Sequence, residues 1–188
     1  MAKSTSFKVS FTLDESDVSY FRTLFRKARK NAAGVDPETI LESASNLVES
    51  VRSQKKAPTF VIEAVDSIED LTQVILDEDY KAPKAVRNQV LGALSYFANP
   101  DDLIPDDIPV LGFLDDAIMI KFVEEEFKHE LWAYRKFRRF RDGAEQRPWT
   151  NVASARLPGR LDVMRKKLRA EVNERRARDE AKGKRGGF

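Results

Sequence analysis

The sequence YFANPDDLIPDDIPVLGFLDD, residues 96–116, decides the fold that we expect for this chain. It holds three of the eight prolines, at positions 100, 105 and 109, and six aspartates that stand as adjacent pairs separated by large apolar residues. Solvated loops carry fewer large apolar residues, and buried segments carry fewer carboxylates. Because proline fixes φ and disfavours helix at the preceding residue, the stretch predicts a packed, proline-stiffened connector between two helices.

The same stretch carries a family resemblance. Residues 97–117, FANPDDLIPDDIPVLGFLDDA, resemble the signature of the YkvA-like family, a domain of unknown function found mainly in bacteria. The resemblance covers roughly residues 86–123, a minority of the chain. It implies a small helical domain and no agreed reaction.

Length and composition indicate a globular domain with extensions. The chain has 188 residues, of which 41% are hydrophobic and 34% charged, and it contains no cysteine. The lack of cysteine excludes disulfides, thiol chemistry and cysteine-ligated zinc or iron–sulfur sites. The N-terminal residues form no apolar run typical of a signal peptide, and no stretch is long and apolar enough for a transmembrane helix. We therefore expect a cytoplasmic protein, with a position peripheral to the membrane as the alternative.

The small net charge of +2 conceals a strong polarity along the chain. Residues 60–130 contain 17 acidic and 5 basic residues, whereas residues 131–188 contain 7 acidic and 18 basic residues. Opposite charges on neighbouring parts of a chain favour docking within the molecule or head-to-tail between molecules.

Apolar residues at helical spacing predict an all-α bundle of five to six helices. We expect helices from Thr12 or Asp14 to about Gly34, from Asp36 to the linker at 53–58, over about 59–76, over 83–98, over 113–141, and after residue 158, with 142–158 irregular. The 113–141 helix should be the longest. The outer face of the third helix should be acidic and consist of Glu63, Asp66, Glu69 and Asp70. The expected division is an arm at 1–13, a helical pair at 14–57, a core YkvA-like domain at 58–141, and a basic helix with a disordered tail at 142–188.

The N-terminal arm reads as an extended strand. Phe7, Val9, Phe11 and Leu13 alternate with polar residues, which is the period of a half-buried strand. No second convincing strand follows in the sequence, so the arm should pair with another chain or lie extended across the first two helices.

The aspartate pairs form the candidate functional loop, which consists of Asp101, Asp102, Asp106, Asp107, Asp115 and Asp116. One interpretation is structural, because aspartates cap turns and helix N-termini and suit the first turn of a helix. The other is a magnesium or calcium site, because clustered carboxylates bind hard cations through oxygen. If a metal binds, Asp102, Asp106, Asp115 and Asp116 are its expected ligands. The structural interpretation is favoured, and no other cofactor is expected.

His129 is the single histidine, and with Glu126 it forms a Glu-x-x-His pair. Di-iron bundles use such a pair twice, and the second histidine does not exist here. We expect His129 on a solvated helix face. No residue is assigned a catalytic role.

The basic C-terminal third is a candidate electrostatic arm, built from Arg165, Lys166, Lys167, Arg169, Arg175, Arg176 and Arg178. It could bind nucleic acid or an anionic membrane surface, dock on the acidic part of its own chain, or serve only to keep the protein soluble.

The function that these patterns favour is a non-enzymatic interaction or regulatory module with a protein partner or a second copy of itself. One alternative is a metal-dependent enzyme that uses the clustered aspartates with magnesium or calcium. The other is a peripheral membrane protein that docks through the apolar connector residues and the basic tail. No phosphate-binding glycine motif occurs, and no motif identifies a small-molecule substrate.

Overall fold

The computed structural model describes residues 12–31, 34–54, 58–98, 114–145 and 151–183, with the side chains of 151–154 excepted. Over these residues the chain is all-α and forms six α-helices and one 3₁₀ turn, with no strand among them. The expected helical bundle is confirmed. Residues 1–11 of the expected arm and residues 99–113 of the connector lie outside the described residues.

The helices follow the order expected from the apolar spacing. They are α1 (Glu15–Asn31), α2 (Pro37–Ser53), α3 (Thr59–Leu76), α4 (Lys84–Leu94) with the 3₁₀ turn η2 (Ser95–Ala98), α5 (Leu114–Glu145) and α6 (Asn151–Ala181). With 32 residues, α5 is the longest of them, as the sequence predicts.

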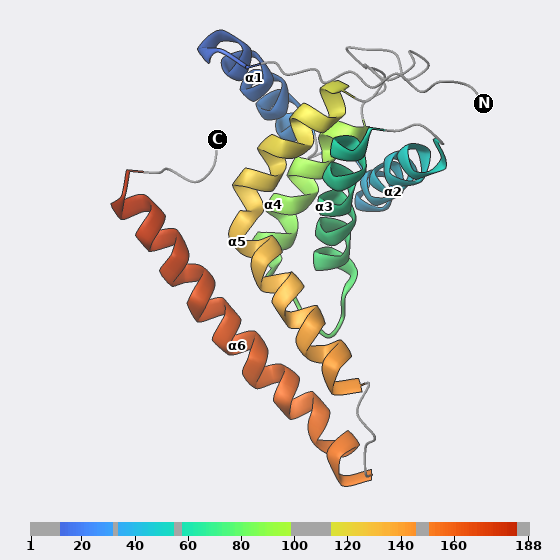
Figure 1. Ribbon diagram of the computed structural model, residues 1–188, viewed down its shortest axis with the longest axis vertical. Coiled ribbons are helices and arrows are strands. Elements are labelled where there is room, and N and C mark those ends of the chain that lie inside the picture. Colours follow the sequence, from blue (N-terminus) through green and yellow to red (C-terminus); the bar gives the residue numbers. More distant parts are fainter. Residues whose placement is uncertain (1–11, 32–33, 55–57, 99–113, 146–150, 184–188) are drawn as a thin grey trace, which may run out of the picture.

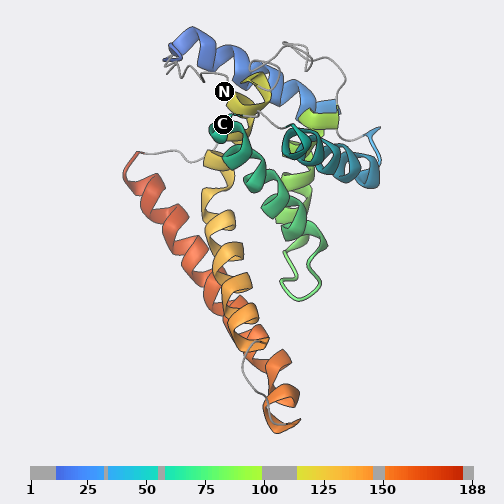
Figure 2. The ribbon, with the colours of Figure 1, turned by 45° about the vertical axis from the view of Figure 1, so that its right-hand side comes forward.

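The bundle is organised around α3 and α5 (Figure 1). Helix α3 packs against α2 on one side and α5 on the other, and α6 runs back antiparallel along α5. Helix α1 lies across the end of the bundle where α5 begins and contacts α4 and η2. Figure 2 shows that α6 and the second half of α5 extend together beyond the other helices. One end of the molecule is therefore built from α1–α4 and the first half of α5, and the other from the pair of α6 and the second half of α5.

Helix α1 begins directly after Asp14, one of the two residues predicted for its start. Its Oδ1 accepts hydrogen bonds from the backbone nitrogens of Ser16 (2.7 Å) and Asp17 (3.0 Å). The Asp14 nitrogen in turn donates to Asp17 Oδ2 at 3.1 Å. This reciprocal pair satisfies donors that the first turn of a helix leaves unpaired. A hydrogen bond from the Ser16 hydroxyl (2.6 Å), together with those from the two backbone nitrogens, holds the pKa of the Asp14 carboxyl below its usual value.

The core of α3 follows the helical spacing of its apolar residues, and the structure corrects the face that was predicted to be acidic. Six apolar residues of α3 at helical spacing are all buried: Val61, Ala64, Val65, Ile68, Leu71 and Ile75. On the face predicted to be acidic and solvated, Glu63, Asp66 and Glu69 are exposed, but Asp70 is only 5% exposed. The prediction was wrong for Asp70 because its carboxylate turns toward two arginines of α5.

Helix α6 starts earlier than the sequence predicts. Residues 151–158, expected to be irregular, are helical, and Pro158 lies inside the helix. Proline lacks the N–H for a helical hydrogen bond, so it usually marks a boundary. The predicted apolar side of α6 is confirmed, with Leu161, Leu168 and Val172 buried and Met164 partly buried against the core. Within the described residues, no helix combines the length and apolar character needed to cross a membrane.

Candidate functional site

Of the six candidate aspartates, the structure describes two. Asp115 and Asp116 lie in the first turn of α5, where the helix dipole favours acids, as the sequence predicts. Asp115 is buried at 4% exposure and Asp116 is half-buried. Asp101, Asp102, Asp106 and Asp107 lie outside the described residues. Among the residues that are described, no three acids or histidines are grouped as a metal site would require.

Two acidic residues with largely buried carboxylates, Asp70 and Asp77, pair with residues of α5 instead. Asp70 of α3 accepts hydrogen bonds from Arg135 Nε (2.6 Å) and Arg138 Nη1 (2.9 Å). Asp77, which follows α3, accepts from Arg141 Nη1 at 2.8 Å and from the Tyr134 hydroxyl at 3.2 Å. These pairs join the acidic and basic parts of the sequence within one molecule.

The most buried charge is the carboxylate of Glu130, with 0% exposure. Its Oε1 accepts a hydrogen bond from the Tyr80 hydroxyl (2.6 Å) and its Oε2 accepts one from Arg169 Nη1 (2.7 Å). Burial, reinforced by the charge of Glu130, raises the pKa of the Tyr80 hydroxyl well above its ordinary value. Burial disfavours the charged form of Arg169, but the hydrogen bond that its guanidinium donates to Glu130 and the negative charge of that carboxylate together outweigh burial and raise the pKa of the guanidinium. One carboxylate therefore joins α5, the α3–α4 loop and α6.

The candidate electrostatic arm is divided between two faces of α6. Arg165 donates to the backbone oxygen of Asp79 (2.6 Å), Arg169 binds Glu130, and the guanidinium of Arg175 lies 3.7 Å from the centre of the Trp132 ring. The outward residues are Lys166, Lys167 and Arg178, which are 78%, 66% and 66% exposed. They lie near Asp162, Glu171 and Glu174 on the same helix, and Arg176 is half-buried. Much of the predicted arm thus docks on its own chain.

His129 is also part of this docking. Its side chain is 14% exposed, and its Nε2 lies 3.1 Å from Asp179 Oδ2 of α6. Lys128 reaches the same carboxylate at 3.0 Å, which helps to hold the pKa of Asp179 below its usual value. The expectation of a solvated histidine was wrong because α6 covers this face of α5. Glu126 does not join His129, since it pairs with Arg29 of α1 at 2.6 Å.

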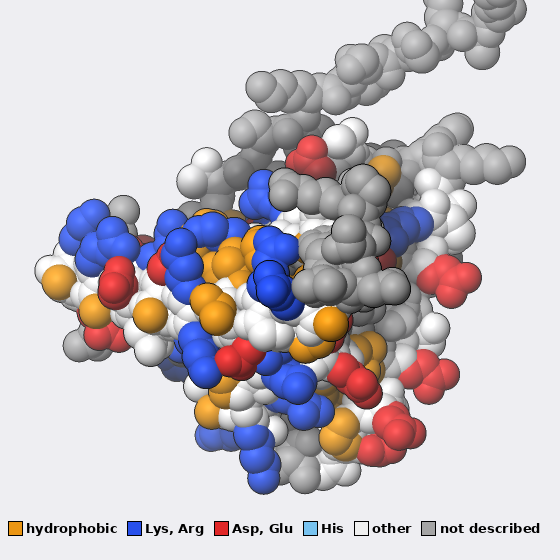
Figure 3. Space-filling model, turned by 90° about the horizontal axis from the view of Figure 1, so that it is seen from below, with side chains coloured by type: hydrophobic (Ala, Val, Ile, Leu, Met, Phe, Trp, Pro, Cys, Tyr) orange, Lys and Arg blue, Asp and Glu red, His pale blue; other side chains and the backbone are white. Residues whose placement is uncertain are grey.

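Charge is distributed unevenly over the end of the molecule seen in Figure 3. Lys and Arg side chains cover the left and centre of this view, and most Asp and Glu side chains lie to the right. The left is the side of α6 in Figure 1 and the right is the side of α2. The separation of acidic and basic residues along the sequence is therefore also a separation in space, although the buried charged residues are paired with one another.

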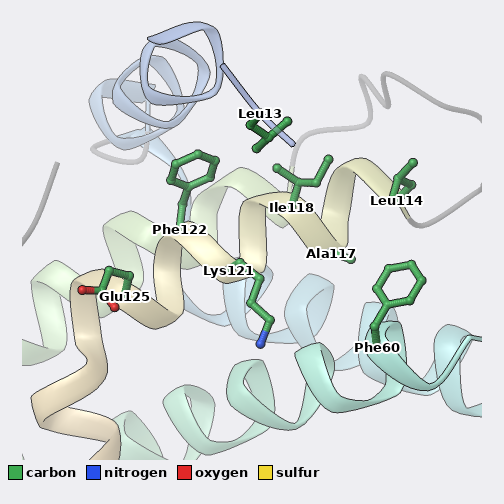
Figure 4. Close-up of a pocket in the computed structure, with 8 residues that line it drawn as sticks. All are labelled: Leu13, Phe60, Leu114, Ala117, Ile118, Lys121, Phe122 and Glu125. Atoms are coloured by element: carbon green, nitrogen blue, oxygen red, sulfur yellow. The ribbon is translucent and has the colours of Figure 1, made fainter. Parts of the chain in front are cut away.

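An apolar groove lies at the other end of the molecule, where α5 begins. It has a volume of about 420 Å³ and is lined, among the described residues, by Leu13, Phe60, Leu114, Ala117, Ile118, Phe122, Lys121 and Glu125. Figure 4 shows Leu13 above Ile118, with Phe60 of α3 on the opposite side and Ala117 between them. Phe60 is 46% exposed. Ile118 and Phe122 stand at helical spacing in the expected 113–141 helix, but such spacing does not reveal where one end of an apolar stripe is left uncovered, so the sequence did not predict the groove.

The comparison with known protein families matches a segment that contributes to this groove. A family model described as a protein of unknown function (DUF1232) matches residues 88–122. The matched segment runs from α4 through the connector to the first turns of α5, and it contains Leu114, Ala117, Ile118, Lys121 and Phe122 of the groove. No curated protein and no solved structure matches the chain. The matched segment holds more than half of the groove residues and none of the paired acids of α3 or Glu130.

Proposed function

We propose that the protein is a non-enzymatic interaction module whose apolar groove binds an apolar segment of a partner protein. The groove itself carries this proposal. Its volume lies within the range of specific binding sites, and its floor and walls are aliphatic and aromatic. Amphipathic helices commonly lay an apolar face into grooves of this kind. We further propose that the family match reflects kinship with the YkvA-like family.

The polar groups around the groove favour binding over chemistry. Only Lys121 and Glu125 among its described lining residues are titratable. Lys121 Nζ is hydrogen-bonded to Glu124 Oε2 at 2.6 Å, and Lys128 Nζ to Glu125 Oε1 at 2.6 Å. General acid–base chemistry needs groups aimed at a substrate, usually with shifted pKa values. A rim of two opposite charges is better suited to orient a partner than to transfer a proton.

Site-specific photo-crosslinking in cells tests this function. A photoreactive residue replaces Lys121, which is exposed at the groove rim, or Arg139, which is exposed on α5 far from the groove. We expect a crosslinked protein from position 121 and not from position 139. The Phe60→Ser substitution should remove that product, whereas Leu76→Ser, at a 53% exposed position of the same helix, should not. Crosslinking that ignores the Phe60 substitution would refute the proposal.

The metal-dependent alternative is tested by thermal unfolding with EDTA, magnesium or calcium. We expect the cations to leave the melting temperature unchanged, and Asp115→Asn and Asp116→Asn to lower it through the weakened start of α5. A rise with millimolar cation that both substitutions abolish would establish a cation site and favour the enzymatic alternative.

A further inference from the structure

We propose that the apolar face of residues 7–11 occupies the groove of its own chain and competes there with a partner segment. The competition rests on the proposed function, whereas the occupancy does not. The structure describes the chain from Thr12 onward, and Leu13 already lines the groove. The eleven preceding residues are therefore tethered at the groove itself.

The first two described residues keep the alternation that the sequence predicts. Thr12 is exposed and Leu13 is half-buried. In an extended chain, every second side chain points to the same face, about 6.6 Å from the last. Phe11, Val9 and Phe7 would thus follow Leu13 on the groove face, and Lys8 and Ser10 would face solvent with Thr12.

The groove offers space for the next side chain in this series. Leu13 lies over Ile118, and the part of the groove bounded by Leu114, Ala117 and Phe60 continues away from it (Figure 4). Ile118 and Leu114 are one helical turn apart, about 6 Å along α5, which matches the spacing from Leu13 to Phe11. Phe11 would cover the exposed ring of Phe60. Contiguous apolar surfaces are rarely left exposed, so a covering contact at this ring is favoured.

The tether favours the same chain over a second copy. A segment joined to its site by one residue is present there at an effective concentration in the millimolar range, far above that of another molecule in a cell. An arm held in this way lowers the apparent affinity of any competing segment, which becomes the intrinsic affinity multiplied by the fraction of time that the groove is free.

Paramagnetic NMR tests the occupancy, because the chain has no cysteine and one introduced cysteine gives a single labelling site. A nitroxide on Ser10→Cys lies on the solvent face of the arm. We expect it to broaden the amide signals of Phe60, Ala117 and Ile118 and to spare that of Leu76. A second substitution, Phe11→Asp, should weaken the broadening of the groove signals, and the matched Lys8→Asp on the other face of the arm should not.

Two outcomes overturn the occupancy. One is broadening of the groove signals in the labelled chain that Phe11→Asp leaves unchanged. The other is broadening when a labelled ¹⁴N chain is mixed with an unlabelled ¹⁵N chain, since this assigns the arm to a second copy. Crosslinking from position 121 separates the two proposals. Phe11→Asp should increase the crosslinked product several-fold, and an unchanged yield refutes competition. Broadening that Phe11→Asp weakens, without any crosslinked product, leaves the arm docked and refutes the partner-binding function instead.

Discussion

At the residue scale, Glu130 shows how position within a stripe outweighs residue type. Glu130 follows the acidic run at 124–126, which is typical of a solvated face, and it is not among the residues that the sequence predicts to be functional. Yet Glu130 follows Phe127 by three residues and precedes Tyr134 by four, which is the spacing of the buried face of α5. Helical spacing could therefore have placed it in the core, but not its partners, which come from 50 residues earlier and 39 residues later.

Removing the Glu130 carboxylate should be costly. Glu130→Ala leaves the Tyr80 hydroxyl and the Arg169 guanidinium without their partner in a buried site, and breaking such a pair typically costs about 3–5 kcal/mol. The matched Glu125→Ala, at a 63% exposed side chain in a surface pair with Lys128, should cost less than about 1 kcal/mol. Urea unfolding of the two variants measures the difference. Equal losses of stability would contradict the buried network.

Tyr134 predicts a loss of stability in alkaline solution. Burial, with the charge of Asp77, raises the pKa of Tyr134 to about 12 from its ordinary value of 10.0. Between these values the unfolded chain releases the proton and the folded chain retains it, so the free energy of unfolding falls as pH rises. Below pH 10 the contribution is intact.

Urea unfolding at several pH values from 9 to about 11.5 checks this window. Tyr134→Phe should flatten the decline, although Tyr80 contributes a decline in the same direction because its pKa is also raised. Tyr20→Phe, at a 50% exposed position of α1, is the control and should leave the slope as in the parent. Identical slopes in all three proteins would show that Tyr134 is not held neutral.

At the element scale, local sequence signals predicted where helices start. Where those predictions failed, contacts between residues far apart in the sequence determine the structure. Asp14 and Asp36 were predicted as N-terminal residues of α1 and α2, and both helices begin directly after them. Such signals act within one turn, so a sequence reveals them. Residues up to Pro158 were predicted to be irregular, with the helix beginning after them, but α6 begins at Asn151 and continues through the proline. The buried residues Leu161, Leu168 and Val172, which pack α6 on the molecule, supply the compensation that a local pattern does not show.

Pro158 should therefore be a weak point of α6. Pro158→Ala adds a helical hydrogen bond and removes a ring clash, and the intrinsic difference inside a helix is up to about 3 kcal/mol. We expect a higher melting temperature and slower amide exchange over residues 155–162. Gly159→Ala, next in the helix and with open space around it, gives a comparison of about 1 kcal/mol. Unaltered amide exchange in the Pro158 variant would mean that the first turns of α6 are not limited by the proline.

At the scale of the whole molecule, charge is used first to hold the chain together. The sequence predicted the polarity and left open whether the basic third docks on its own acidic part. Docking is what the structure shows, through Arg135 and Arg138 on Asp70, and Arg169 on Glu130. The sequence could not decide this, because net charge does not say which face of a helix each base occupies. The apolar groove could not be predicted from the sequence for a related reason, since its described walls come from α3, α5 and the residues before α1.

This distribution leads us to expect weak binding of anions by the C-terminal arm. The bases that remain outward are Lys166, Lys167 and Arg178. Each lies within one helical turn of an acidic residue, whose negative charge offsets the positive potential around it. Retention on heparin, RNA or anionic vesicles should be confined to low salt, because exposed charges are screened beyond about 8 Å at physiological ionic strength. Replacing the three bases by glutamine should abolish that retention without changing the melting temperature. Retention at physiological salt that the same substitutions remove would instead make the outer face of α6 a binding surface for nucleic acid or membrane lipid, according to the matrix that retains it.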